Sequence, residues 1–310
     1  MKVTWYHYYI PKVFSTASFL VNPIFVYLVF TGKSKKLGNY RFLLLYFATF
    51  NVTYSVFDLL VPVGIHTYRY SFTVFINDGL FFKYSEFHFI MLAARCSLVS
   101  CSYAVLISHF LYRYLIVKKP ELLKHHFLRF MLSSFILCIL YFMIWYKVGE
   151  GLGYLDQEKE EYLHEHFKSY YNVNVDDLNI IVALFNEATP KTVMTTWFGV
   201  GVLTVLSCIS VTVFIVLGFL IMKTLRGVNM HMSQKTTKLQ MDLLRALVVQ
   251  TVIPLFVSFT PCFLSWYAPA FNIDLGSGIN SFNSIAIAAF PWFDPVAIVL
   301  CLPVLRHRIF

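Results

Sequence analysis

The chain has 310 residues, of which 58% are hydrophobic and only 13% are charged, with a formal net charge of +9. Soluble domains carry about 25% charged residues, so this composition excludes an ordinary soluble protein and indicates a membrane protein. The basic residues lie in short connections between apolar runs rather than in one arm, so we expect no nucleic-acid partner.

Apolar runs recur along the whole chain. A helix needs about 20 apolar residues to cross the hydrocarbon core of a bilayer, and the sequence contains seven runs near this length. We therefore predict an all-α membrane protein that forms one seven-transmembrane helix bundle. Because the first residues are polar and aromatic, we expect no cleavable signal peptide. The predicted spans are residues 11–30, 42–65, 87–117, 130–146, 196–222, 243–267 and 279–302.

Basic residues are distributed unevenly between the two sides of this predicted bundle. The connections after the first, third and fifth spans, with the C-terminus, carry sixteen Lys and Arg residues and two acidic residues. The opposite side carries eight basic and twelve acidic residues. Short loops rich in Lys and Arg stay in the cytoplasm. We therefore predict that the N-terminus is outside and the C-terminus inside.

The largest predicted loop, residues 147–195, then lies on the outer side and is strongly acidic. We expect a helix over Asp156–Tyr171 but no independent domain. The loop contains no cysteine, and all six cysteines of the chain lie in apolar runs. We therefore expect a loop that is held without a disulfide.

Two opposite charges lie inside the second and third predicted spans. Counted from the same face of the membrane, Asp58 and Arg95 both lie roughly 12–13 Å deep at 1.5 Å per residue. A lone charge in lipid is costly, so we predict an ion pair. The pair is either purely structural or also lines a ligand pocket. Candidate ligand-binding residues, chosen by depth, are Asp58, Met91, Arg95, Trp197, Phe256, Trp266 and Tyr267.

A second coincidence of depth lies nearer the cytoplasmic side. Asn22, Asn51 and Asp294 fall roughly 12–14 Å from the inner ends of the first, second and seventh spans. Polar side chains at one level in lipid tend to contact one another across helices. We predict an interior polar cluster; the alternative is three unconnected polar residues.

The sequence Tyr112-Arg113-Tyr114 lies near the end of the third predicted span. An arginine followed by a tyrosine at this place resembles the acid-Arg-Tyr signature of G-protein-coupled receptors, although Tyr112 replaces the acid. Alternatively, Arg113 only extends to the lipid headgroups. The residues expected to couple to a partner are Tyr112, Arg113, Tyr114, Lys223, Arg226, Lys235 and Lys238.

Several segments resemble those of nematode seven-transmembrane chemoreceptors of the Str superfamily, and in particular its Srj class. The resemblance extends from the first predicted span to the last. The segments that carry it are Asn22–Phe25, Lys36–Leu44, Tyr54–Asp58, Pro62–Arg69, His109–Tyr114, Gln250–Pro254 and Phe290–Pro295.

This resemblance implies a G-protein-coupled receptor for a small odorant or water-soluble cue. It also implies a heterotrimeric G protein as partner and a place in the plasma membrane of a sensory cilium. We expect no cofactor, no metal and no enzymatic activity, because no nucleophile or metal-ligand arrangement is present in the sequence. The alternative function is a seven-helix ligand-gated channel or transporter, although channels of the insect odorant-receptor kind have their N-terminus inside.

Overall fold

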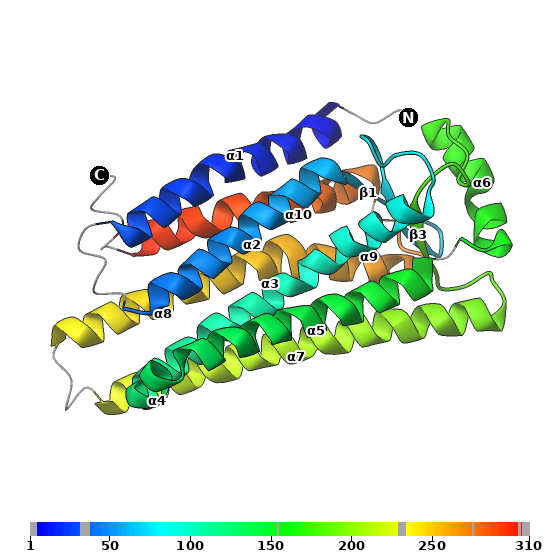
Figure 1. Ribbon diagram of the computed structural model, residues 1–310. Helices are drawn as coiled ribbons and strands as arrows, with labels where there is room; N and C mark the ends of the chain where they lie inside the picture. Colours follow the sequence, from blue (N-terminus) through cyan, green and yellow to red (C-terminus); the bar gives the residue numbers. More distant parts are fainter. Residues whose placement is uncertain are drawn as a thin grey trace.

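The computed structural model describes residues 5–31, 38–153, 155–228, 234–274, 276–302 and 305. Long helices lie side by side, and the first described helix begins at the end of the bundle opposite to where the last one finishes (Figure 1). This arrangement agrees with an odd number of crossings and with the predicted seven-helix bundle. The crossing segments are α1 (Trp5–Phe30), α2 (Tyr40–Leu60), α3 (Glu86–Lys118), α5 (Phe127–Gly153), α7 (Pro190–Val228), a composite of α8, η2 and α9, and α10 (Gly276–Cys301).

Within the described residues, six of these helices are long and apolar enough to span a membrane. The composite segment is less regular: α8 (Gln234–Pro254) continues into one π-helical stretch, η2 (Leu255–Phe259), and then into α9 (Thr260–Ala270). Pro254 and Pro261 flank this stretch. Because proline has no backbone N–H to donate, the regular hydrogen-bond ladder is interrupted there, and a widened turn accommodates the interruption.

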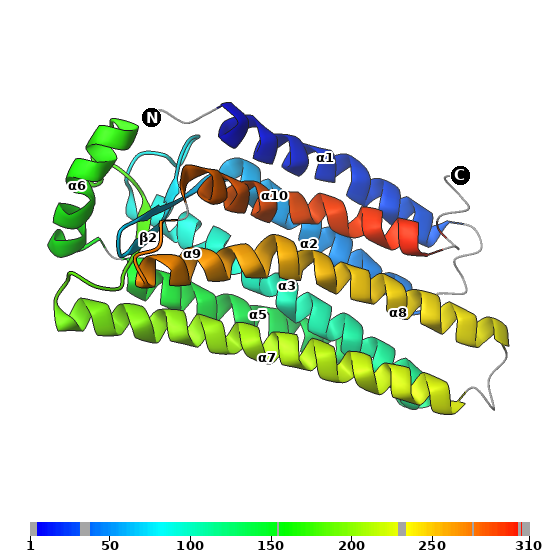
Figure 2. The same cartoon turned by 180° about the vertical axis from the view of Figure 1, so that it is seen from behind.

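One end of the bundle carries a small antiparallel sheet of three strands in the order β1-β2-β3. β1 (Val63–Tyr68) and β2 (Ser71–Ile76) follow α2, whereas β3 (Ile180–Leu184) comes from the large loop after α5. Helix α6 (Gln157–Tyr171) crosses beyond the sheet at this end (Figure 2). We call it the sheet end. The opposite end, where α1 finishes and α2 begins, we call the basic end, and the short α4 (Pro120–His125) lies there.

The sheet is buried on both faces. Alternate strand residues such as Ile65, Val74 and Ile181 point toward the helices and join the main core. Their neighbours, among them Phe75 and Val182, pack against Phe167 and other α6 residues in a second core. Side chains alternate between the faces of a strand, so a short apolar strand can join two cores at once. The sheet and α6 therefore close one end of the bundle in layers.

The structure differs from the predicted boundaries at the sheet end. Helix α2 ends at Leu60 rather than near residue 65, because residues 63–68 pair as a strand instead of continuing the helix. Helices α5 and α7 extend into the predicted loop 147–195, which is therefore shorter than expected. The helix expected over Asp156–Tyr171 is confirmed by α6. Five cysteines whose side chains are described are free: Cys96, Cys101, Cys138, Cys208 and Cys301.

Gly64 is required for the close approach of two strands. It lies opposite Phe75 in the β1–β2 pair, and a Cβ atom at this position would lie 2.8 Å from Cζ of the Phe75 ring. Phe75 is only 1% exposed and is held between the sheet and α6. Its ring therefore has little freedom to move away from a larger residue.

We predict that Gly64→Val destabilises the sheet end by about 1–3 kcal/mol, as overpacking of a core does. The thermal unfolding midpoint of the purified protein should fall, and adding Phe75→Leu should restore part of it. Gly151→Val is the matched control, because a Cβ at Gly151 meets no atom within 4 Å. Equal midpoints for the two single variants would contradict this account of Gly64.

Candidate functional site

A cavity of about 90 Å³ lies between the inward face of the sheet and the helices beneath it. We call it the roofed cavity, because the strands cover it at the sheet end. Among the described residues that line it, Arg95 alone carries a charge. The strands contribute Val63, Ile65, Phe72, Val74, Ile181 and Ala183, and the helices contribute Arg95, Cys96, Val99, Trp145, Gly149, Leu152, Val200, Leu203, Trp266 and Ile287.

The predicted ion pair between Asp58 and Arg95 is confirmed. An Nη atom of Arg95 on α3 donates to the Asp58 carboxylate on α2, and both side chains are buried. The hydroxyl of Ser15 on α1 donates to the other carboxylate oxygen. The guanidinium carbon also lies 4.2 Å from the ring centroid of Tyr54. The pair thus joins three helices, and each of the two buried charges compensates the other.

Two donors at the roofed cavity remain without an acceptor. Within the described part of the chain, no group accepts a hydrogen bond from Nε of Arg95 or from the indole nitrogen of Trp145, although both atoms are buried. Leaving a buried donor unpaired costs about 1–3 kcal/mol. Because both residues line the same small cavity, a ligand with an acceptor atom would recover this energy.

The structure brings only part of the predicted ligand-binding set to the cavity. Arg95 and Trp266 line it, and the Trp266 ring lies 5.7 Å from that of Trp145. Phe256 is 69% exposed on the outer surface, because depth along a helix does not determine the direction of a side chain around it. Of the remaining four, Asp58 binds Arg95, Met91 packs beside the main core, Trp197 is 40% exposed and Tyr267 is hydrogen-bonded to Thr204.

The interior polar cluster is formed in part. The amide nitrogen of Asn51 donates to the side-chain oxygen of Asn22 at 3.4 Å, and Asn22 in turn donates to the carbonyl of Pro291 on α10 at 3.1 Å. Asp294 lies one turn farther along α10 and is 1% exposed. No described hydrogen bond involves Oδ1 of Asp294. The cluster therefore connects α1, α2 and α10 through Asn22.

Arg113 is buried at the basic end rather than extended toward the lipid headgroups. It is 3% exposed, and its guanidinium carbon lies 3.5 Å from the ring centroid of Tyr40 at the start of α2. The Tyr40 hydroxyl is 3.1 Å from Nδ1 of His109, one turn earlier on α3. An aromatic face attracts a cation electrostatically. The Tyr40 ring thus contacts the Arg113 guanidinium, which an acidic residue at position 112 would otherwise have paired with.

The other predicted coupling residues differ in how exposed their side chains are. Tyr112 is buried against Tyr40, whereas Tyr114 is partly buried and accepts a hydrogen bond from Lys118. Lys223 is exposed near the end of α7. The side chains of Arg226, Lys235 and Lys238 lie outside the described residues.

The profile of the family described as "Serpentine type 7TM GPCR chemoreceptor Srj" matches residues 1–309. The chain belongs to the Srj family of chemoreceptors.

Individual relatives agree with this family. The chain is 42% identical to Serpentine receptor class J-38 of Caenorhabditis elegans, over 98% of this chain and 92% of that protein. It is 26% identical to Serpentine receptor class r-10 of Caenorhabditis briggsae, over 94% and 86% of the two chains. It is 22% identical to G-protein coupled receptor str-33 of Caenorhabditis elegans, over 93% and 84%.

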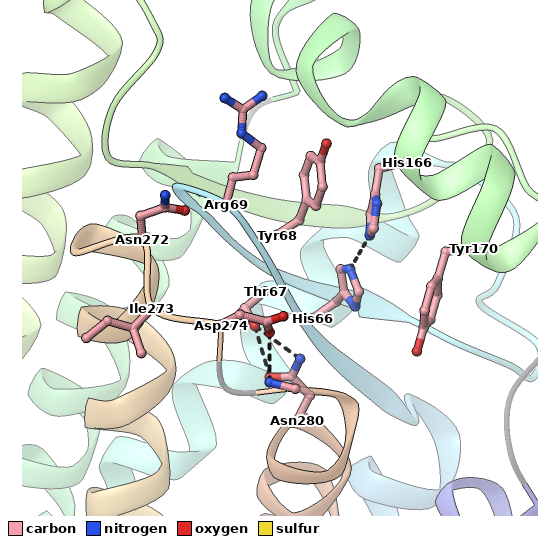
Figure 3. A pocket seen from close by; sticks show the side chains of 11 residues that line it. His66, Thr67, Tyr68, Arg69, His166, Tyr170, Asn272, Ile273, Asp274 and Asn280 are labelled. Carbon is pink, nitrogen blue, oxygen red and sulfur yellow. Dashed lines mark hydrogen bonds between the residues drawn. The ribbon is translucent and has the colours of Figure 1, made fainter.

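This Srj-family chain has a second cavity, of about 360 Å³, on the other side of β1 (Figure 3). We call it the histidine cavity. His66 on β1 and His166 on α6 point toward each other, and their Nε2 atoms are 2.8 Å apart. The hydroxyl of Tyr171 lies 3.0 Å from the other ring nitrogen of His66. Asp274 and Asn280 line the cavity from the segment between α9 and α10 and from α10 itself.

Both imidazoles are neutral at pH 7. Burial and the neighbouring His166 lower the pKa of His66 to about 4, although Asp274 acts in the opposite direction. Burial also lowers the pKa of His166. A single proton therefore lies between the two facing nitrogens, so that one ring donates and the other accepts.

We predict that Asp58→Asn or Arg95→Gln alone reduces the yield of folded protein sharply, because each leaves a buried charge unpaired at a cost of about 3–5 kcal/mol. The double variant should recover part of the yield. Yield is measured as the monodisperse fraction in size-exclusion chromatography. The half-exposed pair Lys12–Asp78 is the control, where single changes should cost less than about 1 kcal/mol. A double variant that folds no better than the worse single variant would refute the coupling.

We also predict that the sheet end becomes less stable in acid. The folded pKa of His66 lies below the ordinary histidine value of 6.5, so its contribution is complete above pH 6.5 and is lost as the pH falls from 6.5 toward 4. At one pKa unit per 1.36 kcal/mol, the loss is about 2 kcal/mol at pH 5 and about 3 kcal/mol once the pH is below 4. Thermal unfolding at pH 7.5 and pH 5 measures it. His66→Gln should show a smaller decrease than the unmodified protein, and an equal decrease would contradict the prediction.

Proposed function

We propose that this chain is a chemoreceptor that binds a small, mainly apolar molecule with a hydrogen-bond acceptor in the roofed cavity and then activates a heterotrimeric G protein. Membership of the Srj family supports the receptor role. The observation that carries the ligand class is the pair of unpaired buried donors, Arg95 Nε and Trp145 Nε1, in an otherwise apolar wall. A carbonyl, ester or ether oxygen placed between them would satisfy donors that an alkane leaves unpaired.

The size and charge of the cavity narrow the ligand further. Its volume of about 90 Å³ is smaller than the roughly 150 Å³ of a cavity that takes up benzene, which favours ligands of about six non-hydrogen atoms or fewer. Because Asp58 already neutralises Arg95, a ligand carboxylate would bring a second, unbalanced charge into the interior. We therefore favour neutral ligands over acids and amines.

The basic end is the proposed contact for the G protein. The candidate coupling residues are Tyr112, Arg113, Tyr114, Lys223, Arg226, Lys235 and Lys238. In this proposal Arg113, now packed on Tyr40, becomes accessible when the helices repack. The polar cluster at Asn22 and Asn51 lies between the cavity and this end and connects α1, α2 and α10. A change in one helix contact can therefore be transmitted to the others.

The asymmetry of basic residues supports a membrane orientation with the sheet end outside and the basic end in the cytoplasm. In this orientation the roofed cavity faces the environment and the coupling residues face the G protein. We further propose that the protein resides in the plasma membrane of a sensory cilium. A ligand-gated channel or transporter, the alternative function, receives no support from the family or from these relatives.

The test compares ligands that share one chain length. A short-chain ketone, ether, alkane, amine and carboxylic acid are applied to cells that express the receptor with a G protein whose activation is read optically. We predict that the ketone or ether is at least about tenfold more potent than the alkane, since about 1.4 kcal/mol corresponds to tenfold. Trp145→Phe keeps an aromatic ring but removes the indole N–H donor, so it should reduce this preference by about tenfold.

Trp197→Phe is the matched control, because Trp197 does not line the cavity and is 40% exposed. Surface expression is measured for each variant in the same cells. Equal potency of ketone and alkane, or an equal effect of the two tryptophan changes, would exclude the roofed cavity as the ligand site. A ligand-evoked current that persists without any G protein would support the channel instead.

A further inference from the structure

The histidine cavity is separate from the roofed cavity and has chemistry that the proposed function does not use. The strand β1 separates the two: Ile65 faces the roofed cavity, whereas its neighbour His66 faces α6. His66 and His166 come from elements 100 residues apart and meet with Nε2 atoms 2.8 Å apart. We propose that these two histidines bind a divalent transition-metal ion, with Zn²⁺ as the simplest case.

Both rings are held in the orientation that a metal site requires. The Tyr171 hydroxyl lies 3.0 Å from Nδ1 of His66, so that its Nε2 points away toward the cavity. The His166 ring is stacked between Tyr68, at 3.8 Å between centroids, and Tyr170, at 5.7 Å. Groups that fix a histidine through its second nitrogen or its plane are typical of metal sites. The two Nε2 atoms are therefore already positioned to bind one ion.

The geometry fits a metal ion after a small adjustment. Two Zn–N bonds of about 2.0–2.1 Å in a tetrahedral site place the nitrogens about 3.3 Å apart. The observed 2.8 Å therefore has to widen by about 0.5 Å. His166 is only partly buried on α6 and can supply this movement. In the site, the ion would lie where the rings now share a proton, and that proton would move to Nδ1 of the ring that carries it, so that each neutral ring keeps one N–H and offers an Nε2 lone pair.

The surroundings indicate how strongly the ion would bind. The histidine cavity, of about 360 Å³, leaves room for water at the remaining coordination positions, and Asp274 on its wall adds a negative charge. Arg69 on the rim is paired with Glu187. Among the described residues there is no group of three His, Cys, Asp or Glu side chains that could hold a metal. We therefore expect an exchangeable site of micromolar affinity, and tighter binding of Cu²⁺ than of Zn²⁺.

A bound ion would connect α6 to β1, and so strengthen the layer that covers the roofed cavity. The rate at which a ligand enters and leaves the roofed cavity through this layer would then depend on the metal concentration. This consequence rests on the proposed function, whereas the metal site itself does not. The experiment therefore measures metal binding without any signalling readout.

Zn²⁺ and Mg²⁺ are titrated as chlorides into the purified full-length protein, and the thermal unfolding midpoint is recorded. A ligand that binds only the folded state at a hundred times its Kd raises the midpoint of a protein this size by several degrees. We expect such a shift with micromolar Zn²⁺ and none with Mg²⁺, which prefers oxygen ligands. His166→Gln and His66→Gln should each abolish the Zn²⁺ shift.

His164→Gln is the matched control, because His164 lies two residues before His166 on α6 and does not line the cavity. It should keep the full Zn²⁺ shift. If His66→Gln fails to fold, His166→Gln is used alone, because the His166 side chain is only partly buried. Electron paramagnetic resonance of bound Cu²⁺ is then recorded as a second measurement. It should report two nitrogen ligands in the unmodified protein and fewer in the variant. A Zn²⁺ shift that survives both histidine changes would overturn the proposal. So would the absence of a shift with either ion in the unmodified protein.

Discussion

A cation that is enclosed by a lipid-embedded bundle has no access to water, and the structure around Arg95 follows from this constraint. The guanidinium needs a counter-charge at its own depth, and Asp58 supplies it from the neighbouring helix. The Tyr54 ring lies against the guanidinium, and Ser15 donates to the other oxygen of Asp58, which brings α1 into the same arrangement. Asp58 pairs with an Nη atom, whereas Nε finds no acceptor among the described residues, and Arg95 lines the roofed cavity. Among the described residues, Arg95 thus connects three helices and is the one charged residue that lines the cavity.

The sheet organises the chemistry of its end by simple alternation. Residues that point toward the helices are apolar and cover the roofed cavity, whereas His66 and Tyr68 point the other way and meet α6. Two cores, one on each face, hold the sheet in place. Apolar packing and hydrogen bonds thus join α6 to the bundle, and β3, which comes from the same loop, pairs with β2 as a part of this layer.

Much of this arrangement follows from counting residues along helices. Depth is proportional to residue number at 1.5 Å per residue, so the contacts of Asp58 with Arg95 and of Asn22 with Asn51 could be predicted from the sequence. Depth does not determine the direction of a side chain around the helix axis. Phe256 is therefore predicted at the cavity but lies exposed on the surface of the bundle.

The pairing of strands from distant loops could not be predicted from the sequence. The strand Val63–Tyr68 continues an apolar run, and its partner Ser71–Ile76 pairs in turn with a segment about a hundred residues later. The meeting of His66 with His166 depends on that pairing. The burial of Arg113 likewise depends on the aromatic face that Tyr40 presents from another helix.

The widened turn η2 has a geometric consequence for the whole segment that contains it. Each residue of an α-helix advances the chain by about 100° around the axis. A π-helical turn accommodates one residue more than an α-helical turn, so conversion of Leu255–Phe259 to regular α-helix would rotate α9 against α8 by about one residue step. Trp266 would then leave the wall of the roofed cavity, and a different side of α9 would face α10. Such a change of winding at Leu255–Phe259 would exchange the residues that α9 presents to its neighbours without any translation of the helix along its axis.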